Sequence, residues 1–393
     1  MCPNNQLRLS MLYMVLLLLI SLESTVVLAK RPEPRASMSS DERSDYITEL
    51  RQLYSGPPSS WPAPHVEEDV SWRELGQIPE VADPCENPRT VEKIELGRKL
   101  FFDPRLSGSG QLACASCHEP DLFWSDGRAV SFGHNRTQLT RNAPSLLHGG
   151  LRDSFFWDGR AESLEAQAEA VLTNPDEMHS SAEKITQNLS SLPDYTEQFE
   201  KVFGIGTPTM EKVKQALAAF ERTLVGGQSH FDQFLKGRSE ALTDSELAGL
   251  HLFRTDARCM NCHHGPLLTD DQFHHIGLSN YGTRFEDLGR YKVTKDPKDV
   301  GAFRTPSLRN VGRTAPYMHS GMFTLEEVLT LYNAGMPSLR RRRDQQEDPL
   351  FPTKSSRIKP LHLNEQDLQD LEAFLHSLSE PQHRIEPPPL PTF

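Results

Sequence analysis

The sequence predicts a mainly α-helical protein with two halves of similar organisation. The five-residue pattern C-x-x-C-H occurs at Cys114–His118 and again at Cys259–His263, 145 residues further along the 393-residue chain. Each copy follows an apolar stretch with helical spacing, and no segment alternates apolar and polar residues over the length of a strand ladder. A repeat at this long spacing indicates the internal duplication of a whole module.

C-x-x-C-H is the attachment motif of a c-type haem. Two thiols add across the two vinyl groups of one porphyrin, so they must lie one short turn apart, and the next imidazole becomes the proximal iron ligand. The alternatives for such a pattern are a zinc knuckle and a redox dithiol. Two covalently bound haem c groups are expected, held by Cys114, Cys117 and His118 and by Cys259, Cys262 and His263.

Composition limits the possible partners. The formal net charge of -12 argues against nucleic acid and against an anionic membrane surface, and it permits a partner with a basic docking face. Hydrophobic residues make up 37% of the chain, which suits a soluble protein, and the length is sufficient for two domains. Cys85 is the one cysteine of the mature chain without a haem to hold, which favours a free thiol over a disulfide framework.

The first 29 residues are predicted to be an export signal. Arg8 is the only charge before an apolar run over 11–20, and Ala29 offers a small residue for cleavage. The alternative is an uncleaved anchor, but Glu23 interrupts the apolar stretch and leaves it short for a membrane span. Because covalent haem attachment happens outside the cytoplasm, a periplasmic location is expected.

Residues 30–78 are rich in Pro, Ser and charge, which predicts a flexible leader with one short helix. The first haem domain is expected over 79–240 and the second over 241–393. The charged segment 337–360, with Arg340–Arg343, favours a solvated loop over a docking patch. Helices are predicted over 41–53, 90–102, 161–172, 180–192 and 209–224, from the capping box at 243–246 onward, and over 364–378.

Further motifs connect the chain to a known family. They are LGRKLFFDPRLS at 96–107, RNAPS at 141–145, FWDGRA at 156–161, PDEM at 175–178, RTPSLRNV at 304–311 and APYMHSG at 315–321. With the two haem motifs, this ordered set resembles the bacterial di-haem cytochrome c peroxidase and MauG family from about Leu96 to Leu378. The resemblance implies two c-type cytochrome-like haem domains packed together with long loops, the first peroxidatic and the second an electron-transfer domain.

The resemblance also implies roles for three residues of the first domain. Glu177 matches the family's catalytic acid and base. A carboxyl group suits this role, because burial beside a haem can raise its pKa toward neutrality. Gln167 matches a glutamine that hydrogen-bonds a bound oxygen species. Trp157 matches the tryptophan that lies between the two haems and carries electrons.

Distal iron ligands are implied on both haems. His134 matches a histidine that caps the first haem in family members that require reductive activation. On the second haem most peroxidases of the family use a methionine, but motif alignment places Tyr332 there, as in the MauG branch. Met318, Met322 and Met336 lie nearby in the sequence and could supply a sulfur instead.

A structural calcium ion is implied between the domains. The family's ligand positions match Asn142, Thr314 and Pro316, and a carboxamide oxygen with two backbone carbonyls suits a hard cation completed by water.

The expected function is that of an exported di-haem peroxidase. Hydrogen peroxide would be reduced to water at the His118 haem, with electrons from a small donor protein, a cytochrome c or a cupredoxin, entering through the His263 haem. The first alternative is a MauG-like enzyme that oxidises a side chain of a partner protein. The second is a di-haem electron carrier or sensor without turnover. A homodimer is possible in each case.

Overall fold

The computed structural model describes residues 34–382 and 384–391 of the chain. The chain from Arg35 onward forms one compact unit. The predicted export signal at 1–29 lies outside the described residues. Within the described ranges, no helix combines the length and the apolar character needed to cross a membrane.

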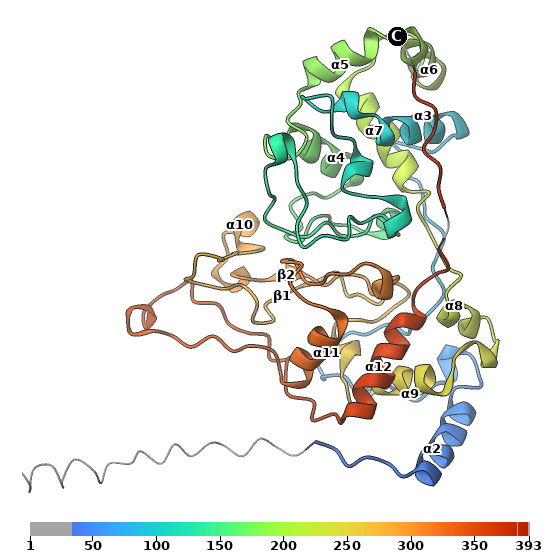
Figure 1. Cartoon of the computed structure of the whole chain (residues 1–393), viewed down its shortest axis with the longest axis vertical. Helices are drawn as coiled ribbons and strands as arrows, with labels where there is room; N and C mark the ends of the chain where they lie inside the picture. Colours follow the sequence, from blue (N-terminus) through green and yellow to red (C-terminus); the bar gives the residue numbers. More distant parts are fainter. Residues whose placement is uncertain (1–33, 383, 392–393) are drawn as a thin grey trace, which may run out of the picture. The chain divides into compact units, whose positions relative to one another are not determined.

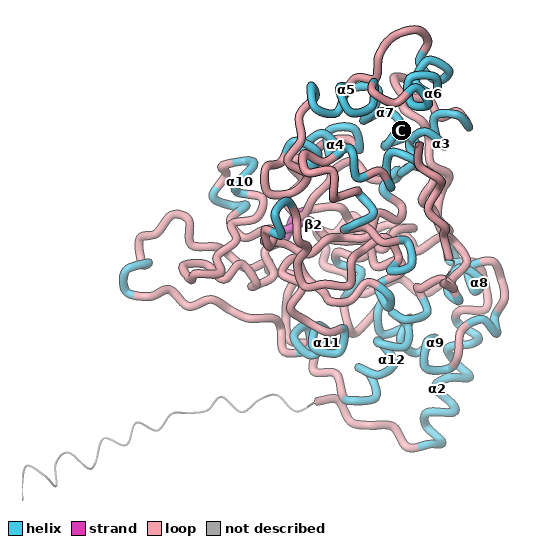
Figure 2. Tube along the Cα trace, turned by 45° about the horizontal axis from the view of Figure 1, so that its top comes forward, coloured by secondary structure: helices cyan, strands magenta, loops and turns pink. Residues whose placement is uncertain are grey.

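The unit is mainly helical, as the sequence predicts, with long loops between short helices (Figure 2). Its only two strands among the described residues are β1 and β2, which pair antiparallel. The elements are α2 (Ser40–Leu53), α3 (Val91–Phe102), α4 (Leu164–Thr173), α5 (Ala182–Ser190), α6 (Pro193–Phe203), α7 (Met210–Glu221), α8 (His230–Leu235), α9 (Asp244–Arg254), β1 (Phe273–His274), α10 (Tyr291–Thr294), β2 (Phe303–Arg304), α11 (Leu325–Asn333) and α12 (Glu365–Ser377).

Each half is built on one close helix crossing. In the first half α3 packs on α7, and a Cβ placed on Gly97 would lie 1.9 Å from the backbone oxygen of Ala216. In the second half α9 packs on α12, and a Cβ on Gly249 would lie at the same distance from the backbone oxygen of Asp370. In both halves the helix that precedes C-x-x-C-H therefore crosses its partner at a glycine, which supports the internal duplication.

Two large apolar cores follow the two halves of the sequence. The first takes its members from residues 96–224 and includes Tyr195, whose hydroxyl donates to the buried Asp103 at 2.5 Å. The second takes its members from 231–378 together with residues of the 47–75 segment. In Figure 1 the helices α3 to α7 gather in one region and α8, α9, α11 and α12 in another.

From residue 34 onward, the segment predicted as a flexible leader is packed instead. The predicted helix is confirmed as α2, which Ser39 opens with a capping box. Trp61 and Leu75 are buried in the second core, and Arg43 forms two hydrogen bonds to the carboxylate of Asp370 at 2.7 and 2.8 Å. The prolines that exclude a helix after α2 do not prevent an extended chain from burying its apolar side chains.

The remaining helices follow the sequence with shifted ends. With Ser163 as its cap, α4 begins at Leu164, three residues after the predicted start. The helix expected over 180–192 ends at Ser190. A further helix, α6, follows shortly afterwards and begins at Pro193. Proline is well suited to this position, because the backbone N–H that it lacks has no partner in the first turn of a helix. This helix was not predicted from the sequence, and neither were α8, α10 and α11.

The C-terminal segment returns to the first half after α12 (Figure 1). The guanidinium of Arg98 donates to the backbone oxygen of Glu386 at 2.8 Å, and that of Arg105 donates to the backbone oxygen of Pro391 at 2.9 Å.

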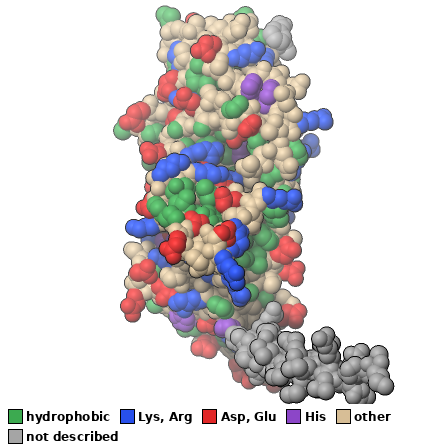
Figure 3. Space-filling view, turned by 90° about the vertical axis from the view of Figure 1, so that its left-hand side faces the viewer, with side chains coloured by type: hydrophobic (Ala, Val, Ile, Leu, Met, Phe, Trp, Pro, Cys, Tyr) green, Lys and Arg blue, Asp and Glu red, His purple; other side chains and the backbone are tan. Residues whose placement is uncertain are grey.

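The loop with Arg340–Arg343 has exposed arginines, as expected for a solvated loop. On the face shown in Figure 3, Lys and Arg side chains lie among Asp and Glu side chains, so the net negative charge does not form one acidic field there.

A buried ion pair fixes α8 to the loop before α11. Nη1 of Arg309 lies 2.6 Å from Oδ1 of Asp232, and these residues are only 5% and 2% exposed. The same guanidinium also donates to the backbone oxygens of Gly76 and Pro266. Removing one partner of such a pair leaves the other charge buried and unpaired.

We expect Asp232→Asn to lower the free energy of unfolding of the holoprotein by about 3 kcal/mol or more. Urea denaturation followed by circular dichroism measures the change. The matched control is Asp344→Asn, which removes an exposed ion pair to Arg342 and is expected to leave the midpoint unchanged. Equal midpoints for the two variants would show that the buried pair contributes no more than an exposed one.

Candidate active site

The first C-x-x-C-H motif lies in the wall of a cavity of about 690 Å³ in the first half. A single turn of 3-10 helix at Cys114–Ser116 places Cys114 and Cys117 on this wall together with His118. Nδ1 of His118 donates to the backbone oxygen of Trp124 at 3.0 Å, so the imidazole is held in one orientation with Nε2 left for another partner. Burial lowers the pKa of His118, which favours the neutral ring that a metal ligand requires.

The second motif repeats this arrangement in a cavity of about 250 Å³ in the second half. Another 3-10 turn at Cys259–Asn261 precedes Cys262 and His263. Nδ1 of His263 donates to the backbone oxygen of Leu268 at 2.9 Å, and burial again lowers the pKa of the imidazole. Both histidines therefore have the second contact that fixes the tautomer of a metal-ligating imidazole.

Arg152 and Arg304 line both cavities, and their charges show whether the lining fits haem c. The Nε atom of Arg152 is buried and has no hydrogen-bond partner among the described residues. Burial, with nearby Arg304, lowers the pKa of Arg152 to about 9. Arg304 pairs with Asp271 at 2.9 Å, so within residues 34–382 and 384–391 Arg152 has no anion of its own. The propionate groups of haem c would supply it, and the thiols and imidazoles described above complete the fit.

The predicted acid and base, Glu177, lies in the first cavity. It follows α4 on a turn where its backbone N–H donates to the oxygen of Asn174 at 3.2 Å. Burial raises the pKa of the Glu177 carboxyl, and this effect exceeds the opposing effects of Arg160 and of a hydrogen bond with Asn174. Gln167, on α4, lines the same cavity. The structure thus brings Glu177 and Gln167 to the cavity that His118 lines.

Trp157 lies in the wall that the two cavities share. Its indole Nε1 donates to the backbone oxygen of Asn142 at 2.9 Å, and its own backbone oxygen accepts from Arg304 at 2.9 Å. The ring meets His319 edge-on, with centroids 6.4 Å apart. These contacts hold the indole in the shared wall, and its role in electron transfer stays a prediction.

His134 does not line the first cavity in this structure, although its neighbour Gly133 does. Its ring stacks on His179 with centroids 4.2 Å apart, and its backbone N–H donates to the oxygen of Glu177 at 2.8 Å. The Nδ1 atom of His134 is buried without a hydrogen-bond partner among the described residues. A ligand role for His134 would therefore require this loop to move.

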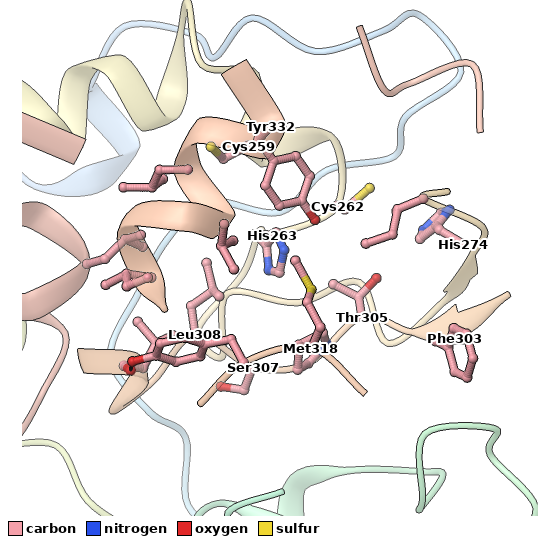
Figure 4. Close-up of a pocket in the computed structure, with 18 of the residues that line it drawn as sticks. Cys259, Cys262, His263, His274, Phe303, Thr305, Ser307, Leu308, Met318 and Tyr332 are labelled. Atoms are coloured by element: carbon pink, nitrogen blue, oxygen red, sulfur yellow. Dashed lines mark hydrogen bonds between the residues drawn. The ribbon is translucent and has the colours of Figure 1, made fainter. Parts of the chain in front are cut away.

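Two candidate distal ligands line the second cavity, Tyr332 and Met318. Figure 4 shows both side chains beside the imidazole of His263, with Tyr332 carried on α11. Burial raises the pKa of the Tyr332 hydroxyl. Of the other methionines considered, Met322 is 70% exposed, and Met336 is buried outside the cavity lining.

The structure brings the three residues matched to a calcium site to the same cavity. Asn142, Thr314 and Pro316 all line the second cavity. The side-chain amide of Asn142 donates to the backbone oxygen of Arg128 at 2.8 Å, which leaves its carboxamide oxygen free of that bond. The calcium site itself stays a prediction.

Several cavity residues were missed by the sequence analysis. Arg160 and Glu221 line the first cavity, and His274 lines the second, where its Nε2 lies 2.8 Å from the Asp270 carboxylate. Burial would lower the pKa of His274, but Asp270 and Cys262 together raise it to about 9. Arg160 and Arg304 lie inside motifs that were recognised, so these motifs were the available signal, whereas nothing in the sequence distinguished Arg152.

Comparisons with known proteins identify relatives of this chain. The family model described as di-haem cytochrome c peroxidase matches residues 91–240. Cytochrome-c peroxidase IdrP1 of Pseudomonas sp. (strain SCT) is 37% identical over 335 residues, which cover 78% of this chain and 85% of that protein. Methylamine utilization protein MauG of Methylorubrum extorquens is 41% identical over 317 residues, covering 79% and 85%.

A solved structure extends the likeness to the fold. The crystal structure of a MauG-like protein associated with microbial copper homeostasis has a TM-score of 0.70 at 33% sequence identity, and it covers 80% of this chain and 96% of that one. The relatives therefore include both peroxidases and MauG-type proteins. The matched stretch in each of these three comparisons covers far more of the chain than the haem motifs. This chain belongs to the di-haem cytochrome c peroxidase and MauG family.

Proposed function

We propose that this protein is a peroxidase that reduces hydrogen peroxide to water with electrons from a small redox protein. The observation that carries the proposal is the presence of Glu177 and Gln167 in the cavity lined by His118. An electron carrier has no use for a buried carboxyl group and an amide at this place. Relatives named cytochrome-c peroxidase support the same reaction.

The first cavity would hold one haem c through Cys114, Cys117 and His118, and the second would hold another through the matching residues. Haem c supplies the iron that binds peroxide and exchanges electrons with it. Glu177 then takes a proton from one peroxide oxygen at its carboxylate and returns it to the other. Its raised pKa suits transfer in both directions. The amide of Gln167 donates a hydrogen bond that orients the oxygen atoms.

Trp157 provides the route for electrons from the second cavity, because it lies in the wall that both cavities share. The net reaction takes two electrons from the donor and two protons from solvent, and it converts one peroxide molecule into two water molecules. The donor proposed is a small cytochrome c or a cupredoxin.

A MauG-type reaction, the oxidation of a side chain of a partner protein, is the second candidate. Tyr332 favours it, since this side chain lines the second cavity where most peroxidases of the family have a methionine ligand. MauG proteins are also among the relatives. The two candidates share the first cavity and differ in how the second haem is tuned.

We further propose that 79–240 and 241–393 are the two haem domains, with the packed segment 40–75 part of the second. A periplasmic location is proposed because covalent haem attachment happens outside the cytoplasm. A calcium ion held by Asn142, Thr314 and Pro316 and the formation of a homodimer are proposed as well.

Peroxide turnover by the purified holoprotein tests the proposal. With a reduced cytochrome c as donor, two molecules should be oxidised for each peroxide consumed, as followed by stopped-flow absorbance. No donor oxidation, combined with a long-lived spectral change after peroxide, would favour the MauG-type reaction. A spectrum that peroxide leaves unchanged would show a carrier or sensor.

A further inference from the structure

Glu221 is a buried carboxyl group that the proposed peroxide chemistry does not use. It is the last residue of α7, it is 5% exposed, and it lines the first cavity. Its Oε2 atom is buried and has no hydrogen-bond partner among the described residues. A polar group left in this state costs free energy unless a further partner or a proton compensates it.

The neighbouring charges do not compensate Glu221. Arg222 follows it in the chain, but the guanidinium of Arg222 donates to both carboxylate oxygens of Glu165 on α4, at 2.8 and 3.0 Å. Lys93 on α3 donates to Asn87 and to a backbone oxygen. The other charged residues of the helices packed on α7 are Glu92, Glu95, Arg98, Lys99, Glu169, Glu183 and Lys184. The other titratable residues that line the cavity are Cys114, Cys117, His118, Arg141, Arg152, Asp158, Arg160, Asp176, Glu177, Lys292 and Arg304.

Burial is the main reason that the Glu221 carboxyl holds its proton. It raises the pKa of Glu221 to about 8, because the effects of Arg222, which lowers the pKa, and of Glu165, which raises it, are smaller. The carboxyl is also close enough to Cys114 for its charge to raise the pKa of that thiol. Glu221 is therefore near the point where the porphyrin would be attached, in surroundings that oppose any uncompensated negative charge.

We propose that Glu221 is the proton acceptor coupled to the redox state of the first haem. As one electron from the external reductant enters the cavity, the Glu221 carboxylate takes up one proton from solvent, and it releases that proton when the electron leaves. The uptake cancels the negative charge that reduction adds to a buried site. The role depends on haem c in the first cavity and not on peroxide turnover.

The direction of the pH effect follows from this coupling. Added negative charge raises the pKa of Glu221 further, so the reduced protein holds the proton at a pH where the oxidised protein has lost it. Raising the pH across this window therefore favours the oxidised state. The midpoint potential of the first haem should fall by about 59 mV for each tenfold decrease in proton concentration, the value for one electron and one proton.

Spectroelectrochemical titration of the holoprotein measures both haem potentials between about pH 6 and pH 10, a window around the Glu221 pKa of about 8. In the unaltered protein one of the two potentials should be nearly flat below this pKa and show the slope above it, and in Glu221→Gln it should be nearly flat throughout. The second haem is an internal reference, because Glu221 lines the first cavity and not the second. Glu162→Gln is the control, because this exposed carboxylate does not line the cavity, and it should keep the slope.

Two outcomes would overturn the assignment. One is a first-haem potential that does not change with pH in the unaltered protein, which needs no variant at all. The other is a slope that Glu221→Gln retains, which would assign the proton to a propionate or to another side chain. If this variant does not take up haem, redox-difference infrared spectra of the unaltered protein decide, since protonation of a carboxylate adds a carboxylic acid band on reduction and its absence contradicts the proposal. Peroxide turnover without a pH-dependent potential would contradict this inference alone. A pH-dependent potential without peroxide turnover would contradict the proposed function alone.

Discussion

Replacing Glu177 by Gln is expected to lower kcat/KM for hydrogen peroxide by about 10² to 10⁴-fold, the range that general acid and base catalysis contributes. The amide keeps the shape of the side chain but cannot accept and return a proton. Stopped-flow measurement of donor oxidation gives the rate. The expected loss is mainly in the chemical step, because Glu177 is one of several side chains that line the cavity and haem attachment does not involve it.

The control for this result is Glu162→Gln. Glu162 is an exposed carboxylate just before α4 that does not line the cavity, so its replacement should leave kcat/KM unchanged. Haem content, measured from the absorbance of both variants, should equal that of the unaltered protein. Unchanged turnover in Glu177→Gln would remove this residue from the reaction and leave Asp176 or a water molecule as the proton carrier.

The parts of the site that the sequence predicted are those fixed by local covalent chemistry. Cys114, Cys117 and His118 must be close to one another whatever the fold, and the structure adds only the carbonyl of Trp124 that holds the ring. Helices such as α3 and α12 were predicted because their apolar spacing and their caps lie within one short stretch. Glu177 required motif matching, since its burial comes from packing around the cavity.

The features that were missed depend on tertiary contacts. Arg152 and Glu221 look like ordinary charged residues in the sequence. Only the fold buries an atom of each that finds no hydrogen-bond partner within the part of the chain that the structure describes. The leader was expected to be flexible because prolines exclude helices, yet Trp61 is buried against the second half. His134 has the sequence position of a distal ligand, but it stacks on His179, which no sequence pattern indicated.

The second cavity contains two possible iron ligands with opposite effects on redox potential. A phenolate is a hard ligand that favours ferric iron, whereas a thioether is soft and favours ferrous iron. Burial raises the pKa of Tyr332, so in the absence of a cation its hydroxyl keeps the proton. A ferric ion can supply the positive charge that makes the phenolate stable in this place.

If Tyr332 is the ligand, Tyr332→Phe should raise the potential of the second haem by about 100 mV or more, part of the roughly 0.8 V range that axial ligands control. Met318→Leu is the matched variant, since Met318 lines the same cavity, and it should then leave the potential nearly unchanged. Spectroelectrochemistry measures both potentials, and EPR of the oxidised protein reports the change in ligand field. The reverse pattern, a fall in potential with Met318→Leu and no change with Tyr332→Phe, would assign the sulfur as ligand.

With a sulfur ligand, the second haem would be the high-potential electron store that a donor-dependent peroxidase needs. A tyrosine ligand makes it a poor store and favours oxidation of a partner protein, so this pair of variants separates the two candidate functions before any substrate is known.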